Sequence, residues 1–231
     1  GIDPAANVAR VAREAGIETI VDFFGVRLAR GLVARGIRAD LIAANNVLAH
    51  VPDVNDFAGG LAPYGAGVFV SDVDAEIVSC VFRENHATAE GGGLNCTRNT
   101  MNISLCDFID NTADYLGGGI SLFQGATNTI ISGNYFARNS SARGGGIGAR
   151  NSGSNTIVNN IIANNTSTSM SGAGIYVYDC SDIRIVNNTV AFNQGGAAHA
   201  LYIGESSTGL TPCKVLNSIF WGASTPSISM S

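Results

Sequence analysis

The chain is poor in charge. Only 13% of its 231 residues are Asp, Glu, Lys or Arg, and the net charge is -5. Lys214 is its single lysine, so arginine carries nearly all of the positive charge. A nucleic-acid-binding surface needs a basic stripe, which this sequence does not contain. The composition therefore excludes nucleic acid as an expected partner.

Long apolar runs are also absent. No stretch of 18 apolar residues occurs, so we expect no membrane span, and the first residues do not form a signal peptide. Hydrophobic residues nevertheless make up 45% of the chain, which is too apolar for disorder and enough for a sizeable core. The composition therefore indicates a folded protein. The sequence does not predict its oligomeric state.

Glycine is abundant, and much of it lies in a repeated phrase of three small residues followed by an aliphatic residue. The triplets begin at Gly65, Gly91, Gly117, Gly144, Gly172 and, in degenerate form, Ala198. Their third residues are 26, 26, 27, 28 and 26 positions apart. A fixed period of this size is typical of a stacked array of repeats.

Each repeat contains alternating apolar and polar residues, bounded by Gly and Asn, which predicts short β-strands. The first strand is clearest at 68–70, 120–122 and 175–177, and the second is expected at 77–82, 103–108, 130–136, 157–162, 183–190 and 215–220. Connections rich in Gly, Asn, Thr and Ser exclude helical crossovers. Because the same residue types recur at the same offset, a solenoid is favoured over a β-sandwich.

One position of the repeat holds Cys80, Cys106, Asn134, Asn160, Asn188 and Ser218. Stacked asparagines at an inward turn can form an amide ladder that satisfies buried polar groups. At the same position Cys80 and Cys106 can form either a thiol ladder or a strained disulfide. The five cysteines have no CxxC spacing, so we expect no metal site, and the redox compartment stays open.

Residues 64 to 224 resemble the right-handed parallel β-helix repeat family, of pectate-lyase-like architecture. The resemblance is carried by the Gly-Gly-Gly-Ile starts and by strands such as Ile185–Val190. It implies an all-β solenoid domain over 63–231, namely a right-handed, single-stranded parallel β-helix of about six coils. Such helices serve as polysaccharide lyases, hydrolases, adhesins and spacers, so the resemblance indicates the fold and leaves the function open.

Residues 1–62 lack this period. The pattern predicts helices over 4–15 and 26–35 and strands over 18–24 and 39–48, which is an α/β arrangement. Three segments, Gly1–Val8, Ile20–Gly25 and Ala43–Asp53, resemble class I S-adenosylmethionine-dependent methyltransferases, closest to the sugar C-methyltransferases.

That resemblance assigns five cofactor contacts: Asp3 to the ribose hydroxyls, Asp22 and Phe23 to adenine, and Asn45 and Asn46 to the rest of the pocket. The family's first strand and its Gly-rich loop would precede Gly1, and the pattern changes to β-helix near Pro63. We therefore expect an incomplete Rossmann-like segment that binds no S-adenosylmethionine and can cap the first coil. A fragment or a chimera of two reading frames is the expected origin.

The best catalytic candidates are Glu84, Asp110 and Arg138, each one residue before a recurrent Asn. Carboxylates stacked about 4.8 Å apart could hold Ca²⁺ or act as acid and nucleophile. The alternative is a solvated charge ladder in which the arginine offsets an acid. The tyrosines and other aromatics at 115, 135, 178, 192 and 221 either stack on sugar rings or belong to the core.

The expected function is a β-helix scaffold or binding module that contacts polysaccharide, without a catalytic site or cofactor. The alternatives are a polysaccharide lyase or glycoside hydrolase acting on an outer face, and an inactive methyltransferase remnant. We expect the β-helix part outside the cell or at its surface, and a methyltransferase-like part in the cytoplasm.

Overall fold

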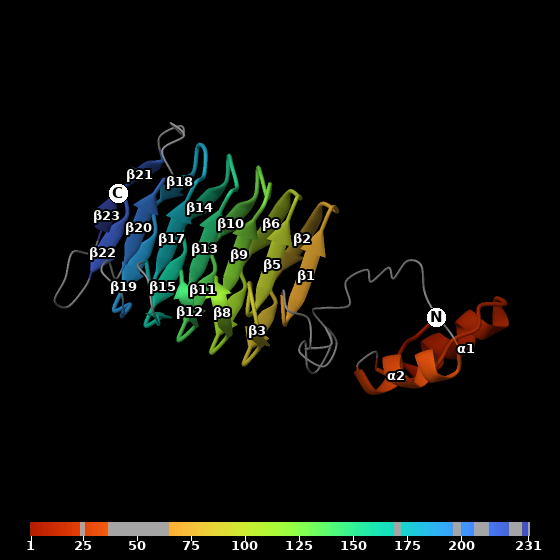
Figure 1. Ribbon diagram of the computed structural model, residues 1–231. Helices are drawn as coiled ribbons and strands as arrows, with labels where there is room; N and C mark the ends of the chain where they lie inside the picture. The colour runs from red at the N-terminus through yellow and green to blue at the C-terminus, as the bar shows by residue number, and fades with distance from the viewer. Residues whose placement is uncertain are drawn as a thin grey trace. The chain divides into compact units, whose positions relative to one another are not determined.

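In the computed structural model, the described residues are 1–23, 26–36, 65–168, 172–195, 200–205, 213–221 and 228–230. The chain forms two compact units, Gly1–Gly59 and Gly60–Ser231, and all strands of the described residues belong to the second unit (Figure 1).

The second unit is a stack of coils whose strands form four parallel sheets. Sheet 1 contains β1 (Val68–Ser71), β5 (Leu94–Thr97), β9 (Ile120–Phe123), β13 (Ile147–Arg150), β17 (Ile175–Tyr178), β20 (Leu201–Gly204) and β23 (Ile228–Met230). Sheet 2 contains β2 (Ala75–Val78), β6 (Met101–Ser104), β10 (Ile130–Ser132), β14 (Thr156–Val158), β18 (Arg184–Val186) and β21 (Lys214–Leu216).

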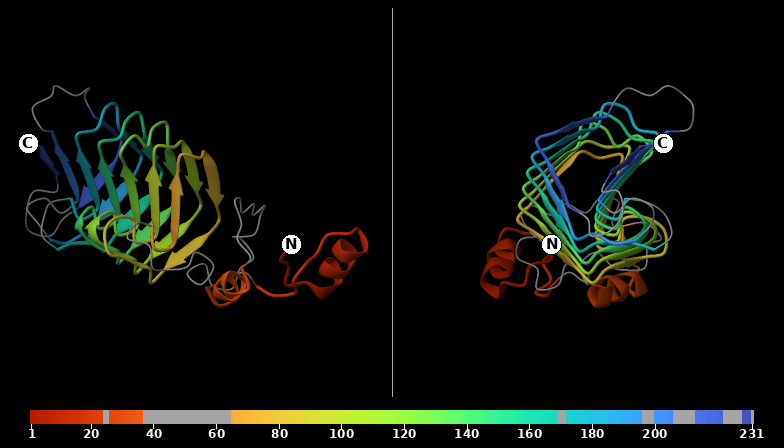
Figure 2. Two further views of the ribbon diagram at one scale, coloured as in Figure 1. Left: turned by 45° about the vertical axis from the view of Figure 1, so that its right-hand side comes forward. Right: turned by 90° about the vertical axis from the view of Figure 1, so that its left-hand side faces the viewer.

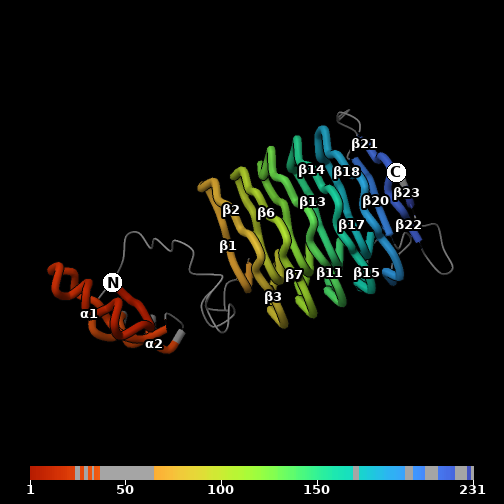
Figure 3. Tube along the Cα trace, turned by 180° about the vertical axis from the view of Figure 1, so that it is seen from behind, coloured from red at the N-terminus to blue at the C-terminus, as the bar shows by residue number. Residues whose placement is uncertain are grey.

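Sheet 3 contains β3 (Val81–Arg83), β7 (Asp107–Ile109), β11 (Tyr135–Ala137), β15 (Ile161–Ala163), β19 (Thr189–Ala191) and β22 (Ile219–Trp221). Sheet 4 contains β4 (His86–Ala87), β8 (Thr112–Leu116), β12 (Ser140–Arg143) and β16 (Thr166–Ser167). Strands of successive coils lie side by side in the same order (Figures 2 and 3). The predicted solenoid is confirmed, with about five well-formed turns, slightly fewer than expected.

The prediction of one long second strand in each repeat is wrong in one respect. The structure has two shorter strands there, which belong to sheets 2 and 3. A left-handed residue makes the corner between them; the first is Ser79, with φ 55°. The equivalent corners are Leu105, Gly133, Asn159, Asn187 and Asn217. Ile77 and Cys80 are buried and both residues between them are exposed, so the alternation slips by one residue at this corner. The sequence prediction treats the two strands as one because a single slip is a weak signal in a short segment.

Columns of like residues fill the interior. The rings of Phe82, Phe108 and Phe136 are stacked at centroid distances of 4.6 and 4.8 Å, and all three are fully buried. These distances match the spacing of neighbouring strands, about 4.8 Å, so equivalent residues of successive coils pack directly on one another.

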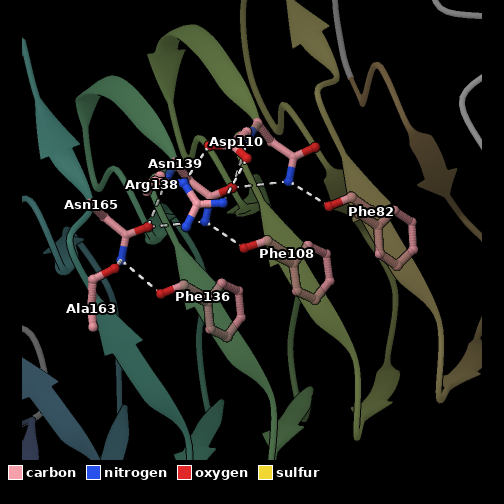
Figure 4. A network of polar contacts seen from close by, with 9 residues as sticks. Phe82, Phe108, Asp110, Phe136, Arg138, Asn139, Ala163 and Asn165 are labelled. Atoms are coloured by element: carbon pink, nitrogen blue, oxygen red, sulfur yellow. Dashed lines mark hydrogen bonds and ion pairs between the residues drawn. The ribbon is translucent and has the colours of Figure 1, made fainter.

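The predicted amide ladder is confirmed. Asn134 donates from Nδ2 to Asn160 Oδ1 at 3.0 Å, and Asn160 donates in the same way to Asn188 at 3.0 Å. A second ladder occupies the recurrent Asn that follows each sheet 3 strand, and its middle member is Asn139 (Figure 4). Because each amide also bonds a backbone carbonyl, both ladders satisfy polar groups that the coils bury.

The triplet glycines allow neighbouring coils to approach closely. A Cβ on Gly119 would lie 2.6 Å from the carbonyl oxygen of Gly146 in the next coil and 2.9 Å from the Phe136 ring. Gly117, at the corner before it, has φ 65°, which side chains disfavour. The repeat therefore requires glycine here for its packing.

The first unit contains α1 (Ala6–Glu14) and α2 (Val26–Ala34), as predicted. The strand expected over 18–24 is reduced to one parallel bridge between Ile2 and Ile20, and the strand expected over 39–48 lies outside the described residues. Among the described helices, none has the length and apolarity to cross a membrane. All five cysteines are free thiols.

Candidate functional site

The structure brings together two of the three residues predicted as catalytic. Arg138 donates from Nε to Asp110 Oδ1 at 2.7 Å and from Nη2 to Asp110 Oδ2 at 2.8 Å (Figure 4). This pairing holds the pKa of Asp110 below its usual range. Glu84 occupies the same left-handed turn position one coil earlier, but no hydrogen bond or ion pair joins it to Asp110 or Arg138. The geometry is that of a charge ladder.

The described residues assigned to cofactor binding interact with residues close to them in the sequence. Asp3 accepts a hydrogen bond from the Ala5 amide at 2.8 Å, ahead of α1. Asp22 pairs with Arg27 at 2.6 Å and accepts the Phe23 amide at 2.9 Å, while the Phe23 ring is exposed. Asn45 and Asn46 lie outside the described residues. The described members of this set therefore make contacts with residues close to them in the sequence.

The predicted aromatic candidates separate into two groups. Tyr135 and Trp221 are exposed on sheet 3, and Phe192 is exposed in the turn column that also contains Asp110. Tyr115 and Tyr178 are half-buried and lie on a different face, beside arginines. This second group belongs to a cluster that sequence reasoning did not assemble.

We call this group the tyrosine–arginine cluster and define it as Tyr115, Arg143, Arg150, Tyr176, Tyr178 and Tyr202. It lies where the ends of β8 and β12 meet the outer face of sheet 1. Along β13 and β17, Ile147, Ala149, Ile175 and Val177 are buried in the core. The alternate residues of these strands therefore face outward, among them Arg150 and Tyr178, which are register partners.

The side chains of the cluster stack on one another. The Arg143 guanidinium carbon lies 4.4 Å from the centroid of the Tyr115 ring. The Arg150 guanidinium carbon lies 5.7 Å from the Tyr115 centroid and 5.8 Å from that of Tyr178, and Arg150 also donates a hydrogen bond to the Tyr115 hydroxyl. These are cation–π distances.

Three tyrosines continue the cluster along β17 and β20. Tyr176 stacks on Tyr202 with ring centroids 5.1 Å apart and planes 6° from parallel, and on Tyr178 at 6.1 Å and 13°. Burial raises the pKa of Tyr176 to about 12, so its hydroxyl keeps its proton and remains a donor at neutral pH.

Glu90 lies at the buried edge of the cluster. It precedes Gly91 as Arg143 precedes Gly144, and only 4% of its surface is exposed. Its Oε2 lies 3.5 Å from Asn95 Nδ2. Burial raises its pKa to about 7, while Asn95 and the positive charge of Arg150 oppose the rise. Glu90 is thus a carboxyl group that gains or loses its proton near neutrality.

Two polar atoms beside Glu90 have no hydrogen-bond partner among the described residues. They are the Ser121 hydroxyl oxygen and Arg150 Nε, both buried. Ser121 faces outward from sheet 1 between its register partners Asn95 and Gly148. Buried polar atoms are normally paired, so this face combines unused hydrogen-bonding capacity with unneutralised charge.

Two regularities of the repeat could have revealed the cluster. The residues before Gly91, Gly117 and Gly144 are Glu90, Leu116 and Arg143, and the fourth residue of the sheet 1 strands includes Arg150 and Tyr178. The sequence does not show that sheet 4 brings these positions over the outer face of sheet 1. Contact between Leu116 and Gly148 demonstrates it, because a Cβ on Gly148 would lie 2.5 Å from Leu116 Cδ1.

Comparisons with known proteins agree with both halves of the chain. The family described as "Right handed beta helix region" matches residues 66–231. The C-methyltransferase NovU of Streptomyces niveus is 29% identical over 132 residues, which cover 53% of this chain and 31% of NovU. The chain thus spans about a third of that relative. No solved structure matches the chain.

Proposed function

The chain belongs to the right-handed β-helix family over residues 66–231, and we propose that it is a carbohydrate-binding module with its site on the outer face of sheet 1. The observation that carries the proposal is the stack of Tyr176, Tyr178 and Tyr202 across β17 and β20, with arginines at its edge.

Aromatic rings offer a flat apolar face with a polar tip, which suits the apolar faces and hydroxyl groups of sugar rings. Here the rings are held on paired strands of a rigid sheet, at Tyr176–Tyr202 and Arg150–Tyr178 register positions. A site on strands loses little conformational freedom when it binds, so modest contacts give measurable affinity.

The Asp110–Arg138 ladder is the second candidate for a functional site. Its carboxylate is already bound by a guanidinium, and the described residues contain no group of three His, Cys, Asp or Glu side chains that could hold a metal ion. The tyrosine–arginine cluster therefore has better support as the binding face.

The test is a panel of soluble polysaccharides titrated against the full chain. Replacing Tyr178 by Ala removes one ring of the stack and is expected to weaken glycan binding at least about tenfold, or about 1.4 kcal/mol. Tyr135→Ala, on sheet 3, is the matched control and should leave affinity unchanged. Equal affinity of wild type and Tyr178→Ala would refute the proposed site, and absence of binding to every glycan would refute the function.

A further inference from the structure

The proposed glycan site carries two positive charges that no described acid neutralises. Arg143 and Arg150 form no ion pair with any acid in the described ranges, whereas five other arginines do. Those five are Arg10, Arg27, Arg98, Arg138 and Arg184. The cluster therefore differs from the rest of the surface in presenting guanidinium groups without a carboxylate partner.

Glu90 is the acid that interacts with Arg150, and it is a weak counterion. Its burial, with 4% of its surface exposed, disfavours the charged form and raises its pKa to about 7. Below neutral pH the carboxyl is protonated and no longer offsets the positive charge of Arg150.

Both guanidinium groups are also held in place before any ligand arrives. Arg150 lies between the Tyr115 and Tyr178 rings, and Arg143 lies on the Tyr115 ring. Ring stacking leaves the edge of a guanidinium free for bidentate hydrogen bonds to a planar or tetrahedral oxyanion. Because the groups are half-buried, water screens their charge less than on an open surface.

Resting on the proposed function, we infer that the ligand is an anionic polysaccharide whose carboxylate or sulfate groups are bound by Arg143 and Arg150. The half-buried rings of Tyr178 and Tyr202 bind the sugar rings, and the buried Tyr176 ring supports them. The arginines at the edge of the stack bind the acidic substituents. The Ser121 hydroxyl and Arg150 Nε are buried on the same face and lie beneath the side chains that the ligand would contact.

The negative net charge of the chain argues against a non-specific attraction of acidic glycans. At -5 the protein as a whole repels polyanions, so diffuse electrostatic attraction does not produce a preference for acidic glycans. Such a preference has to come from a local site.

The test uses three probes with one backbone: dextran, carboxymethyl dextran and dextran sulfate, titrated against the full chain at pH 6 and moderate salt. We expect at least one anionic probe to bind about tenfold or more tightly than dextran. The double variant Arg143→Gln/Arg150→Gln should lose that preference. The control Arg98→Gln/Arg184→Gln removes the same charge from paired, exposed arginines and should retain it. The two anionic probes distinguish carboxylate from sulfate recognition.

The outcomes separate the inference from the function on which it rests. Equal affinity for all three dextrans, or an anion preference that survives in the Arg143→Gln/Arg150→Gln variant, would overturn the inference. Neutral glycan binding that still depends on Tyr178 would then leave the proposed function standing. Binding to no dextran and to no member of the wider panel would overturn both. Far-ultraviolet circular dichroism of the variants distinguishes lost binding from lost folding.

Discussion

Arg143 lies over the ring of Tyr115, with its guanidinium carbon 4.4 Å from the ring centroid, although the two residues belong to neighbouring coils. Leu116 and Arg143 are register partners next to a shift between β8 and β12. This irregularity occurs at the point where sheet 4 meets sheet 1. The proposed binding face thus lies at a local departure from the regular repeat.

Tyr115 is expected to position both arginines. In Tyr115→Phe the ring remains and only the hydroxyl that accepts a hydrogen bond from Arg150 is lost, so affinity for carboxymethyl dextran should fall about threefold. Tyr115→Leu also removes both cation–π contacts and should cost about tenfold or more. Titration calorimetry measures both. A Tyr115→Leu variant that is folded and binds like wild type would contradict this role.

Glu90 makes stability depend on pH. Its folded-state pKa of about 7 lies above the ordinary value of 4.5, so the fold favours the protonated form. Its contribution is complete below pH 4.5 and is lost as the pH rises through about 7, by up to about 3 kcal/mol. Glu90→Gln mimics the neutral form and should be more stable than wild type at pH 8.

Urea denaturation of wild type and Glu90→Gln at pH 5 and pH 8 checks this prediction, because other carboxyl groups contribute equally to both proteins. The stability difference between the two should grow in favour of the variant from pH 5 to pH 8. A difference that stays constant would show that Glu90 is ionised in the folded protein at both pH values.

Asn139 is expected to be among the most sensitive positions of the scaffold. Its side chain donates to the Phe108 carbonyl at 2.8 Å and to Asn165, and accepts from Asn111. Asn139→Ala breaks the ladder and leaves buried polar groups unpaired, at a cost of about 3 kcal/mol or more. Asn164, the exposed residue directly before Asn165, offers a control. Asn164→Asp should change the unfolding free energy by less than about 1 kcal/mol.

The Asp110–Arg138 pair should contribute little to stability. Both side chains are substantially exposed, at 33% and 56%, so solvent screens the interaction. Asp110→Asn, which keeps a residue tolerant of the left-handed turn, should change the unfolding free energy by less than about 1 kcal/mol and leave glycan affinity unchanged. A large loss of affinity or of any glycan-cleaving activity would restore this turn as the functional site.

The first unit is expected to bind no S-adenosylmethionine. Strand pairing among its described residues is limited to the single bridge between Ile2 and Ile20, whereas the cofactor site of this fold lies at the ends of adjacent parallel strands. Titration calorimetry with S-adenosylmethionine should show no binding heat, with an intact class I methyltransferase as the positive control. Saturable binding would mean that the resemblance extends to function.

Much of the scaffold can be predicted from the sequence because its determinants are local and repeated. The glycine triplets, the strand alternation and the asparagine columns each recur once per coil, so every repeat carries the same structural signal. The corner at Ser79 is not predicted, because it is marked in the sequence only by a one-residue slip between the buried residues Ile77 and Cys80. Two repeat offsets indicate the positions of Glu90, Arg143 and Arg150. These residues come together because sheet 4 lies against the outer face of sheet 1, and the sequence alone does not show that packing.

The most direct test of the central claim, that the ligand binds the outer face of sheet 1, is hydroxyl-radical footprinting with and without saturating carboxymethyl dextran. We predict that the ligand protects Tyr178 and Tyr202 and leaves Tyr135 and Trp221 on sheet 3 as reactive as before. Protection of Tyr135 and Trp221, with Tyr178 and Tyr202 unchanged, would contradict the account.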